Sequence, residues 1–195
     1  MIRLILLFLI STSSAFAESV VIGMDKEKVA ITATFDGSQI LLFGAVKRDK
    51  PAPIGDLQVI VTVAGPSERI SVHRKSKVLG IWMNTETVEV DAAPSFYAVA
   101  TSSNFLSTIS DTEDLRYKVS IPRAIRSVGA PMNVLDAVSF SEAVIRIRKE
   151  QGLYKLLENT VEIDEQTLFR TSIGMPADIS EGDYTCLLYT SDAAD

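Results

Sequence analysis

The stretch VLGIWMNTETVEVDAAPSFYAVATS, from Val78 to Ser102, decides the expected fold. Two strand-like runs lie on either side of an Asp-Ala-Ala-Pro corner, and alternation in the first run places Val88 and Val90 on one face. The stretch also holds the only tryptophan, Trp82, together with Phe96. Because large aromatic side chains dominate protein cores, we expect both to be buried, with a ligand or partner contact as the alternative for Trp82.

Similar short runs flank this stretch and are separated by turn signals. Val29 to Phe35 largely alternates and ends at Asp36-Gly37, a pair that favours a type I′ hairpin turn. Gln39 to Val46 is apolar on both faces, as central strands are. Further strands are expected over 57–63, 69–75 and 168–175, the last with alternate residues from Phe169 to Met175 on one face. This spacing predicts a mainly β protein with an Ig-like β-sandwich.

The chain from about residue 104 to residue 154 has a different pattern, because helical spacing replaces alternation. Ser139 and Glu142 have the spacing of a capping box, and apolar residues recur at helical intervals after them. We therefore expect a helical insertion at about 104–154 within the sandwich. Two small domains joined near Pro131 are the alternative.

The N-terminus has the anatomy of a secretory signal peptide. Arg3 precedes an unbroken apolar run from Leu4 to Ile10, and Ala15-Phe16-Ala17 is a small-residue cleavage signal. The apolar run is too short to span a bilayer unaided, although a buried N-terminal helix is the alternative. We expect residues 1–17 to be removed and the mature protein to begin at Glu18 in an exported, oxidising compartment.

The last ten residues, Cys186 to Asp195, match the translation of a transposase adapter used in sequencing libraries. On this interpretation Thr185 is the last native residue, and Cys186, the only cysteine, is not native. An exported domain without cysteine has no disulfide and no thiol nucleophile. A genuine terminal strand from Cys186 to Thr190 is the alternative, and in either case we expect 191–195 to be loose.

The search for chemistry is mostly negative. The net charge of −6 argues against nucleic acid as a partner. No Walker loop or dinucleotide fingerprint is present. His73 is the only histidine and lacks the partners that a catalytic base or a metal site needs, while Asp111, Glu113 and Asp114 indicate a solvated loop and not a calcium loop. We predict no catalytic residue, cofactor or metal.

One positive feature is a basic cluster on an acidic protein. It comprises Arg69, His73, Arg74, Lys75 and Lys77. Such charges commonly guard an edge strand against aggregation. The functional alternative is contact with an anionic ligand, a lipid headgroup or an acidic loop of a partner.

Three runs carry a resemblance to a known family: RKSKVLGIWMNTETVEVDAAPSFYAVATS (74–102), FSEAVIRIRKEQGLY (140–154) and TLFRTSIGMPADISEGDYT (167–185). The chain resembles the alphaproteobacterial putative transmembrane protein family over nearly all of 18–185. The resemblance implies an exported Ig-like β domain followed by one C-terminal membrane helix. It assigns no functional residue. We expect the remaining strands and that helix to be missing from this chain.

Two functions follow. The first is a non-catalytic module of a membrane-anchored protein on the periplasmic side of the inner membrane. The resemblance implies an inner-membrane partner of the transporter type, such as a sulfite exporter, for this module. The alternative is a periplasmic solute-binding protein or enzyme with a pocket near Trp82, Tyr97 and the basic cluster. A concave site with convergent polar groups would favour the alternative, and a flat apolar patch would favour the module.

Overall fold

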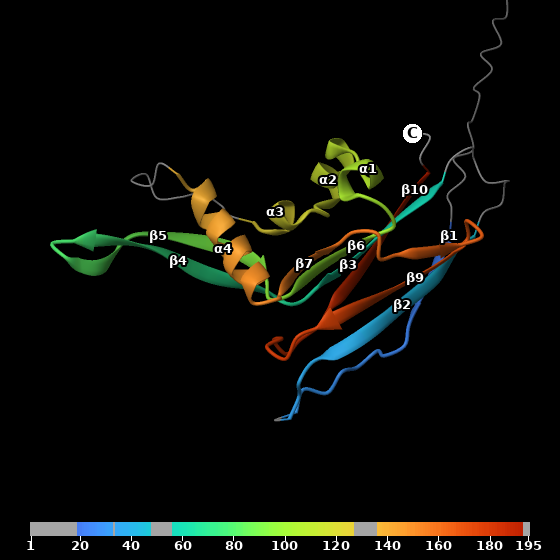
Figure 1. Cartoon of the computed structure of the whole chain (residues 1–195), viewed down its shortest axis with the longest axis horizontal. Coiled ribbons are helices and arrows are strands. Elements are labelled where there is room, and N and C mark those ends of the chain that lie inside the picture. Colours follow the sequence, from blue (N-terminus) through green and yellow to red (C-terminus); the bar gives the residue numbers. More distant parts are fainter. Residues whose placement is uncertain (1–18, 33, 48–55, 127–135, 193–195) are drawn as a thin grey trace, which may run out of the picture.

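The computed structural model describes residues 19–32, 34–47, 56–126 and 136–192. Within these residues the chain is mainly β, as predicted, with short helices between two of the strands. Figure 1 shows two sheets, a group of helices beside them and a hairpin that projects away from both. The expected signal peptide over 1–17 and Pro131, the expected joint of the two-domain alternative, lie outside the described residues.

The first sheet is antiparallel and has the strand order β1-β2-β9-β8. Its strands are β1 (Ser19–Met24), β2 (Ser38–Lys47), β9 (Leu168–Met175) and β8 (Glu162–Asp164). The alternation predicted for β9 is confirmed, because Phe169, Thr171, Ile173 and Met175 are all buried.

Strand β2 lies between β1 and β9, so its predicted central position is confirmed. The prediction that both faces of β2 are buried is wrong. Leu42 and Val46 are buried, whereas Leu41 and Phe43 on the opposite face are exposed, since no second layer covers that face within the described residues.

The second sheet has the order β10-β3-β6-β7. Its strands are β10 (Thr185–Asp192), β3 (Leu57–Ala64), β6 (Tyr97–Thr101) and β7 (Tyr154–Leu157). Strand β6 is buried along its whole length, because the first sheet covers one face and the helices lie against the other. Strands β6 and β7 pair parallel, unlike the antiparallel sheets of Ig domains, so the Ig-like connectivity stays a prediction.

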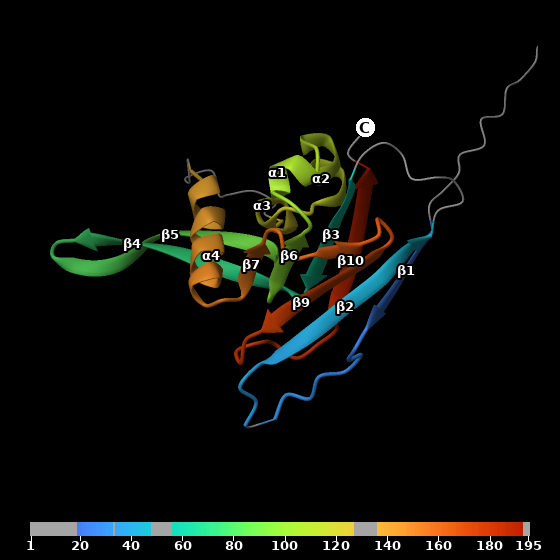
Figure 2. The same ribbon diagram turned by 45° about the vertical axis from the view of Figure 1, so that its right-hand side comes forward.

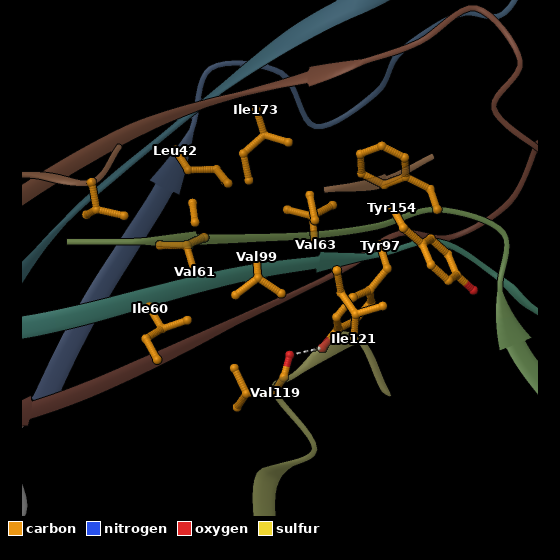
Figure 3. Packing of buried hydrophobic residues seen from close by; sticks show 14 of the residues in the cluster. Leu42, Ile60, Val61, Val63, Tyr97, Val99, Val119, Ile121, Tyr154 and Ile173 are labelled. Atoms are coloured by element: carbon orange, nitrogen blue, oxygen red, sulfur yellow. Dashed lines mark hydrogen bonds between the residues drawn. The ribbon is translucent and has the colours of Figure 1, made fainter. Parts of the chain in front are cut away.

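The core forms where the two sheets face each other. Leu42 and Ile173 of the first sheet meet Val61 and Val63 of the second in one buried cluster (Figure 3). Phe96 is 0% exposed and belongs to the same cluster, so its predicted burial is confirmed.

The strand predicted for Val29–Phe35 is wrong. The described residues there are irregular, and β1 occupies the place beside β2. Asp25 ends β1 by bonding Leu41 twice, through its side chain at 2.9 Å and its backbone N–H at 3.1 Å. Ile31 and Phe35 still pack against the core, so the apolar pattern reports burial there without strand pairing.

The helices lie between β6 and β7, within the stretch predicted as an insertion. They are α1 (Phe105–Thr108), α2 (Asp111–Tyr117), α3 (Ile121–Ala124) and α4 (Val138–Glu150). The Tyr97 hydroxyl donates to the backbone oxygen of Val119 at 2.9 Å, which ties this region to the sandwich (Figure 3).

The capping box predicted for α4 is wrong by two residues. The N-cap is Ala137, which makes no side-chain cap bond, and the helix already includes Ser139. The Asp136 carboxylate accepts from the Ser139 backbone N–H at 3.3 Å instead. An aspartate before the first turn satisfies one of the free N–H groups as well as a serine would.

Strands β4 (Ser67–Val78) and β5 (Ile81–Pro94) form a separate two-stranded sheet, here called the arm. The predicted Asp-Ala-Ala-Pro corner is wrong, because β5 runs through it to Pro94. Figures 1 and 2 show that the far end of the arm projects beyond the sheets and the helices.

Strand β10 pairs with β3 along its whole length, from Thr185 opposite Ala64 to Asp192 opposite Leu57. The expectation that 191–195 would be loose is therefore wrong for 191–192, and 193–195 lie outside the described residues. Cys186 is half-buried, and burial raises the pKa of its thiol.

Candidate functional site

The arm reverses direction in a two-residue turn, Leu79-Gly80. Both residues have positive φ, 50° and 85°, as a type I′ turn requires. Gly80 adopts this conformation freely, whereas Leu79 adopts it against the steric preference of an L side chain. Asn-Gly is the pair that such turns favour, yet this chain has a leucine that is 99% exposed.

Large apolar side chains surround this turn and form what we call the apolar tip. Its members are Val78, Leu79, Ile81, Trp82 and Met83, all exposed. Within the described residues, none of them packs against a buried cluster.

The prediction that Trp82 anchors the core is wrong, because its side chain is 67% exposed. The arm explains the difference. Val88 and Val90, nearer the base of β5, are buried as predicted, but the hairpin continues past the last contact with the body. The only tryptophan therefore lies at the free end.

The basic cluster runs along β4. Alternation places Arg69, His73, Lys75 and Lys77 on one face, which we call the basic face, and Arg74 on the other. All four basic-face residues are exposed. Lys77 lies directly across from Trp82 in the register, so the basic face leads into the apolar tip.

Two members of the basic face have neighbours on β5. An Arg69 guanidinium nitrogen lies 3.7 Å from a carboxylate oxygen of Asp91, and His73 Nδ1 shares a hydrogen bond with the Thr87 hydroxyl at 2.9 Å. A hydroxyl does not make a histidine a general base by itself. His73 lies on an exposed face among other basic side chains.

Arg74 has a different role, because it joins the arm to α4. Its guanidinium bonds Glu86 at 2.8 Å, bonds the Ser139 hydroxyl and lies 4.6 Å from the centre of the Phe140 ring. Phe140 in turn packs with Val88. Of the five predicted contact residues, Arg74 is thus the one that these contacts join to a helix.

The predicted pocket near Trp82 and Tyr97 is not formed. Trp82 is at the free end of the arm, whereas Tyr97 is buried in the second sheet beside Tyr154 (Figure 3). Burial, followed by the charge of Asp114, raises the pKa of Tyr97 to about 12, so this hydroxyl stays protonated.

A cavity of about 680 Å³ lies elsewhere, beside the open edge of the sandwich. It is lined largely by apolar side chains, including Met24, Ile40, Met175 and Tyr184, and neither Trp82 nor a member of the basic cluster lines it. It therefore does not supply the predicted constellation.

The acidic loop predicted around Asp111 is wrong, because these residues form α2. The Ser110 hydroxyl caps the helix by accepting from the Glu113 backbone N–H at 3.3 Å. Asp114 is buried, where it lies 2.9 Å from an Arg123 nitrogen and accepts from the Ser120 backbone N–H at 2.7 Å. Nowhere in the part of the chain that the structure describes do three metal-ligating side chains gather.

The comparisons with known proteins yield one match. A family model described as "Putative transmembrane protein" matches residues 19–192. The chain belongs to this family. Neither the curated proteins nor the solved structures contain a match to it.

Membership confirms the resemblance inferred from the three sequence runs, and the family name describes a membrane-associated protein. Among the described residues, no helix has both the length and the apolar character needed to cross a bilayer. The matched range includes 186–192, and the interpretation of the last ten residues as an adapter translation stays a prediction.

Sequence reasoning missed the apolar tip, although its signal is present. From Lys75 to Met83 the chain reads KSKVLGIWM, where polar-apolar alternation stops and five large apolar residues flank one glycine. A glycine inside such a run, with two large apolar residues before it and three after it, indicates a hairpin turn. A turn there would have placed Trp82 at an end and not in a core.

Proposed function

We propose that this family member is a non-catalytic module on the periplasmic side of the inner membrane, which acts by binding a membrane partner. The observation that carries the proposal is the arm, on which the apolar tip and the basic face are both exposed and continue into each other. Within the described residues, this surface has no role in the cores of the sheets.

Exposure of five large apolar residues needs an explanation, because contiguous apolar patches on soluble surfaces mark sites of interaction. Truncating these side chains would remove no core contact, so folding does not account for them. A binding role does, since such residues lose their contact with water when a partner covers them.

The basic face supports a partner with acidic groups near the membrane. The chain has a net charge of −6, whereas Arg69, His73, Lys75 and Lys77 gather on one side of β4. Glu89 and Asp91 of β5 share this face near Arg69, so the positive region is strongest at Lys75 and Lys77. Such a region on an acidic protein orients it toward a negative surface. An acidic periplasmic loop of a transporter-type membrane protein has this character, and the N-terminal export pattern supports a position of the module on the same side.

The alternative, a solute-binding protein or enzyme, gains no support from a specific observation. It required Trp82, Tyr97 and the basic cluster to converge, and they lie on separate parts of the fold. A surface that projects convexly is suited to contact and poorly suited to enclosing a small substrate.

Photocrosslinking in living cells tests this proposal. A photoreactive amino acid at His73, in the middle of the basic face, should give a crosslinked product with an integral inner-membrane protein, identified by mass spectrometry. The same amino acid at Leu106, an exposed position on α1, is the matched control and should give no such product. Crosslinks from His73 only to soluble periplasmic proteins would contradict the proposal.

A further inference from the structure

We infer that the apolar tip inserts into the interfacial zone of an anionic lipid bilayer, with the lysines behind it at the level of the headgroups. The inference builds on the proposed function, which places the protein at a membrane. It adds that the lipid itself is the occupant of the tip and of the lysines next to it, whereas the protein partner contacts the basic face nearer the body, around His73.

The distribution of apolar groups around the tip favours lipid over a protein groove. Val78 and Ile81 lie opposite each other beside the turn, and Met83 follows on their face. Trp82 is on the opposite face, and Leu79 is at the end. Apolar side chains thus point in several directions, which suits a medium that surrounds the tip.

The order of residues along the hairpin matches the layers of a bilayer surface. At about 3.4 Å per residue, Leu79 would be about 7 Å deeper than Lys77 and about 14 Å deeper than Lys75. Interfacial segments bury apolar groups about 5–10 Å into the boundary between headgroups and acyl chains. Leu79, Val78 and Ile81 would reach that depth, while Trp82 and Lys77 would lie at the headgroups, where aromatic and basic side chains are favoured.

Charge complementarity specifies the lipid. The segment KSKVLGIWM carries two lysines and no acidic residue, in a chain whose net charge is −6. An anionic surface attracts each nearby lysine by a factor of about five in affinity, whereas it repels the acidic body of the protein. The molecule should therefore approach such a surface with the arm first.

The backbone sets a limit on the depth. The arm has two strands, so each strand has one edge whose N–H and C=O groups lack a neighbouring strand among the described residues. These groups cannot enter the hydrocarbon core without losing hydrogen bonds to water. The tip should consequently remain interfacial, and it would not span the bilayer.

The choice of Leu79 is the most specific observation. Asparagine would suit the left-handed backbone and the exposure of this position better than leucine does. The turn thus keeps a residue that is unfavourable for the isolated hairpin and favourable for burial in lipid. Leu79→Asn should raise the melting temperature of the protein and abolish its binding to lipid, two effects of opposite sign.

Tryptophan fluorescence provides the test, because Trp82 is the only tryptophan in the chain. Vesicles of phosphatidylcholine with phosphatidylglycerol should shift the emission of the full chain to shorter wavelength, and brominated lipids should quench it. Vesicles of phosphatidylcholine alone should bind more weakly. Replacing Lys75 and Lys77 by glutamine should lower the affinity for the anionic vesicles about 25-fold.

Leu106→Asn is the matched control, because Leu106 is 84% exposed on α1 and away from the arm (Figure 1). It should leave vesicle binding unchanged, whereas Leu79→Asn should eliminate the emission shift. The inference is overturned if anionic vesicles leave the wild-type emission unmoved, or if Leu79→Asn binds as the wild type does. Unmoved emission together with a persistent crosslink from His73 would overturn the inference about lipid and leave the proposed function standing.

Discussion

Phe96 and Trp82 are large aromatic residues of one short stretch, yet their environments are opposite. Phe96 is 0% exposed beside Tyr184, with ring centres 6.2 Å apart, whereas Trp82 is 67% exposed. Phe96→Ala should lower the free energy of unfolding by about 3–5 kcal/mol, because it leaves a cavity in the core. Trp82→Ala should change it by less than about 0.5 kcal/mol. Urea denaturation of the two variants measures both, and equal losses would contradict the assigned positions.

Two buried tyrosines predict a loss of stability at high pH. Burial raises the pKa of Tyr97 and of Tyr154 to about 12, above the ordinary value of 10.0. The protonated forms are favoured in the folded state, so their contribution is complete below pH 10 and is lost as the pH rises toward 12. The urea concentration at the midpoint of unfolding should therefore fall as the pH is raised from 10 to 12.

The matched variant for this pH dependence is Tyr97→Phe combined with Tyr154→Phe. It removes two ionisable groups, so its urea midpoint should fall less between pH 10 and 12 than that of the wild type. It also removes hydrogen bonds to Val119 and Pro94, so it should be less stable at neutral pH. A pH dependence as steep as that of the wild type would mean that other groups cause it.

At the level of elements, Arg74 fixes the helix α4 against the arm. Arg74→Ala removes the contact with the Phe140 ring and the bond to Ser139, both on α4. Hydrogen exchange at α4 amides should accelerate, because local opening costs less free energy. Lys75→Ala, at the adjacent exposed position, is the control and should leave α4 unchanged. Equal effects of the two substitutions would show that Arg74 does not hold the helix.

The sequence predicted a strand correctly where alternating apolar residues belong to a segment that also pairs with neighbouring strands in a sheet. Strand β9 is such a case, because alternate residues from Phe169 to Met175 face the core. Val29–Phe35 has a similar pattern and is not a strand, since alternation shows which side chains are buried but does not show whether a neighbouring strand is available.

The sequence predicted which residues form the basic cluster, but it could not predict how they are arranged in space. Alternation divides Arg74 from the four members of the basic face, but the contact of Arg74 with α4 joins positions 65 apart in the chain. The position of Trp82 could not be predicted either. A tryptophan is typically a core residue, and only the length of the arm relative to the body shows that Trp82 lies outside the core.

At the level of the whole molecule, the two sheets and the helices form the body, and the arm carries the surface that lacks a role within it. A second exposed apolar region exists on the outer face of the first sheet, around Val21, Phe43 and Leu168. It carries no comparable group of basic side chains among the described residues, and Arg170 there is paired with Glu162 at 2.6 Å. The arm and the outer face of the first sheet are therefore alternative surfaces for contact with the membrane.

Hydrogen exchange of the protein on membranes, compared with the protein in solution, separates these two regions directly. If the arm is the contact surface, protection on membranes should appear between Lys75 and Asn84, and amides of β1, β2 and β9 should exchange at the same rate in both samples. Protection at Val21, Phe43 and Leu168, with an unchanged arm, would contradict the assignment of the arm as the surface that meets the membrane.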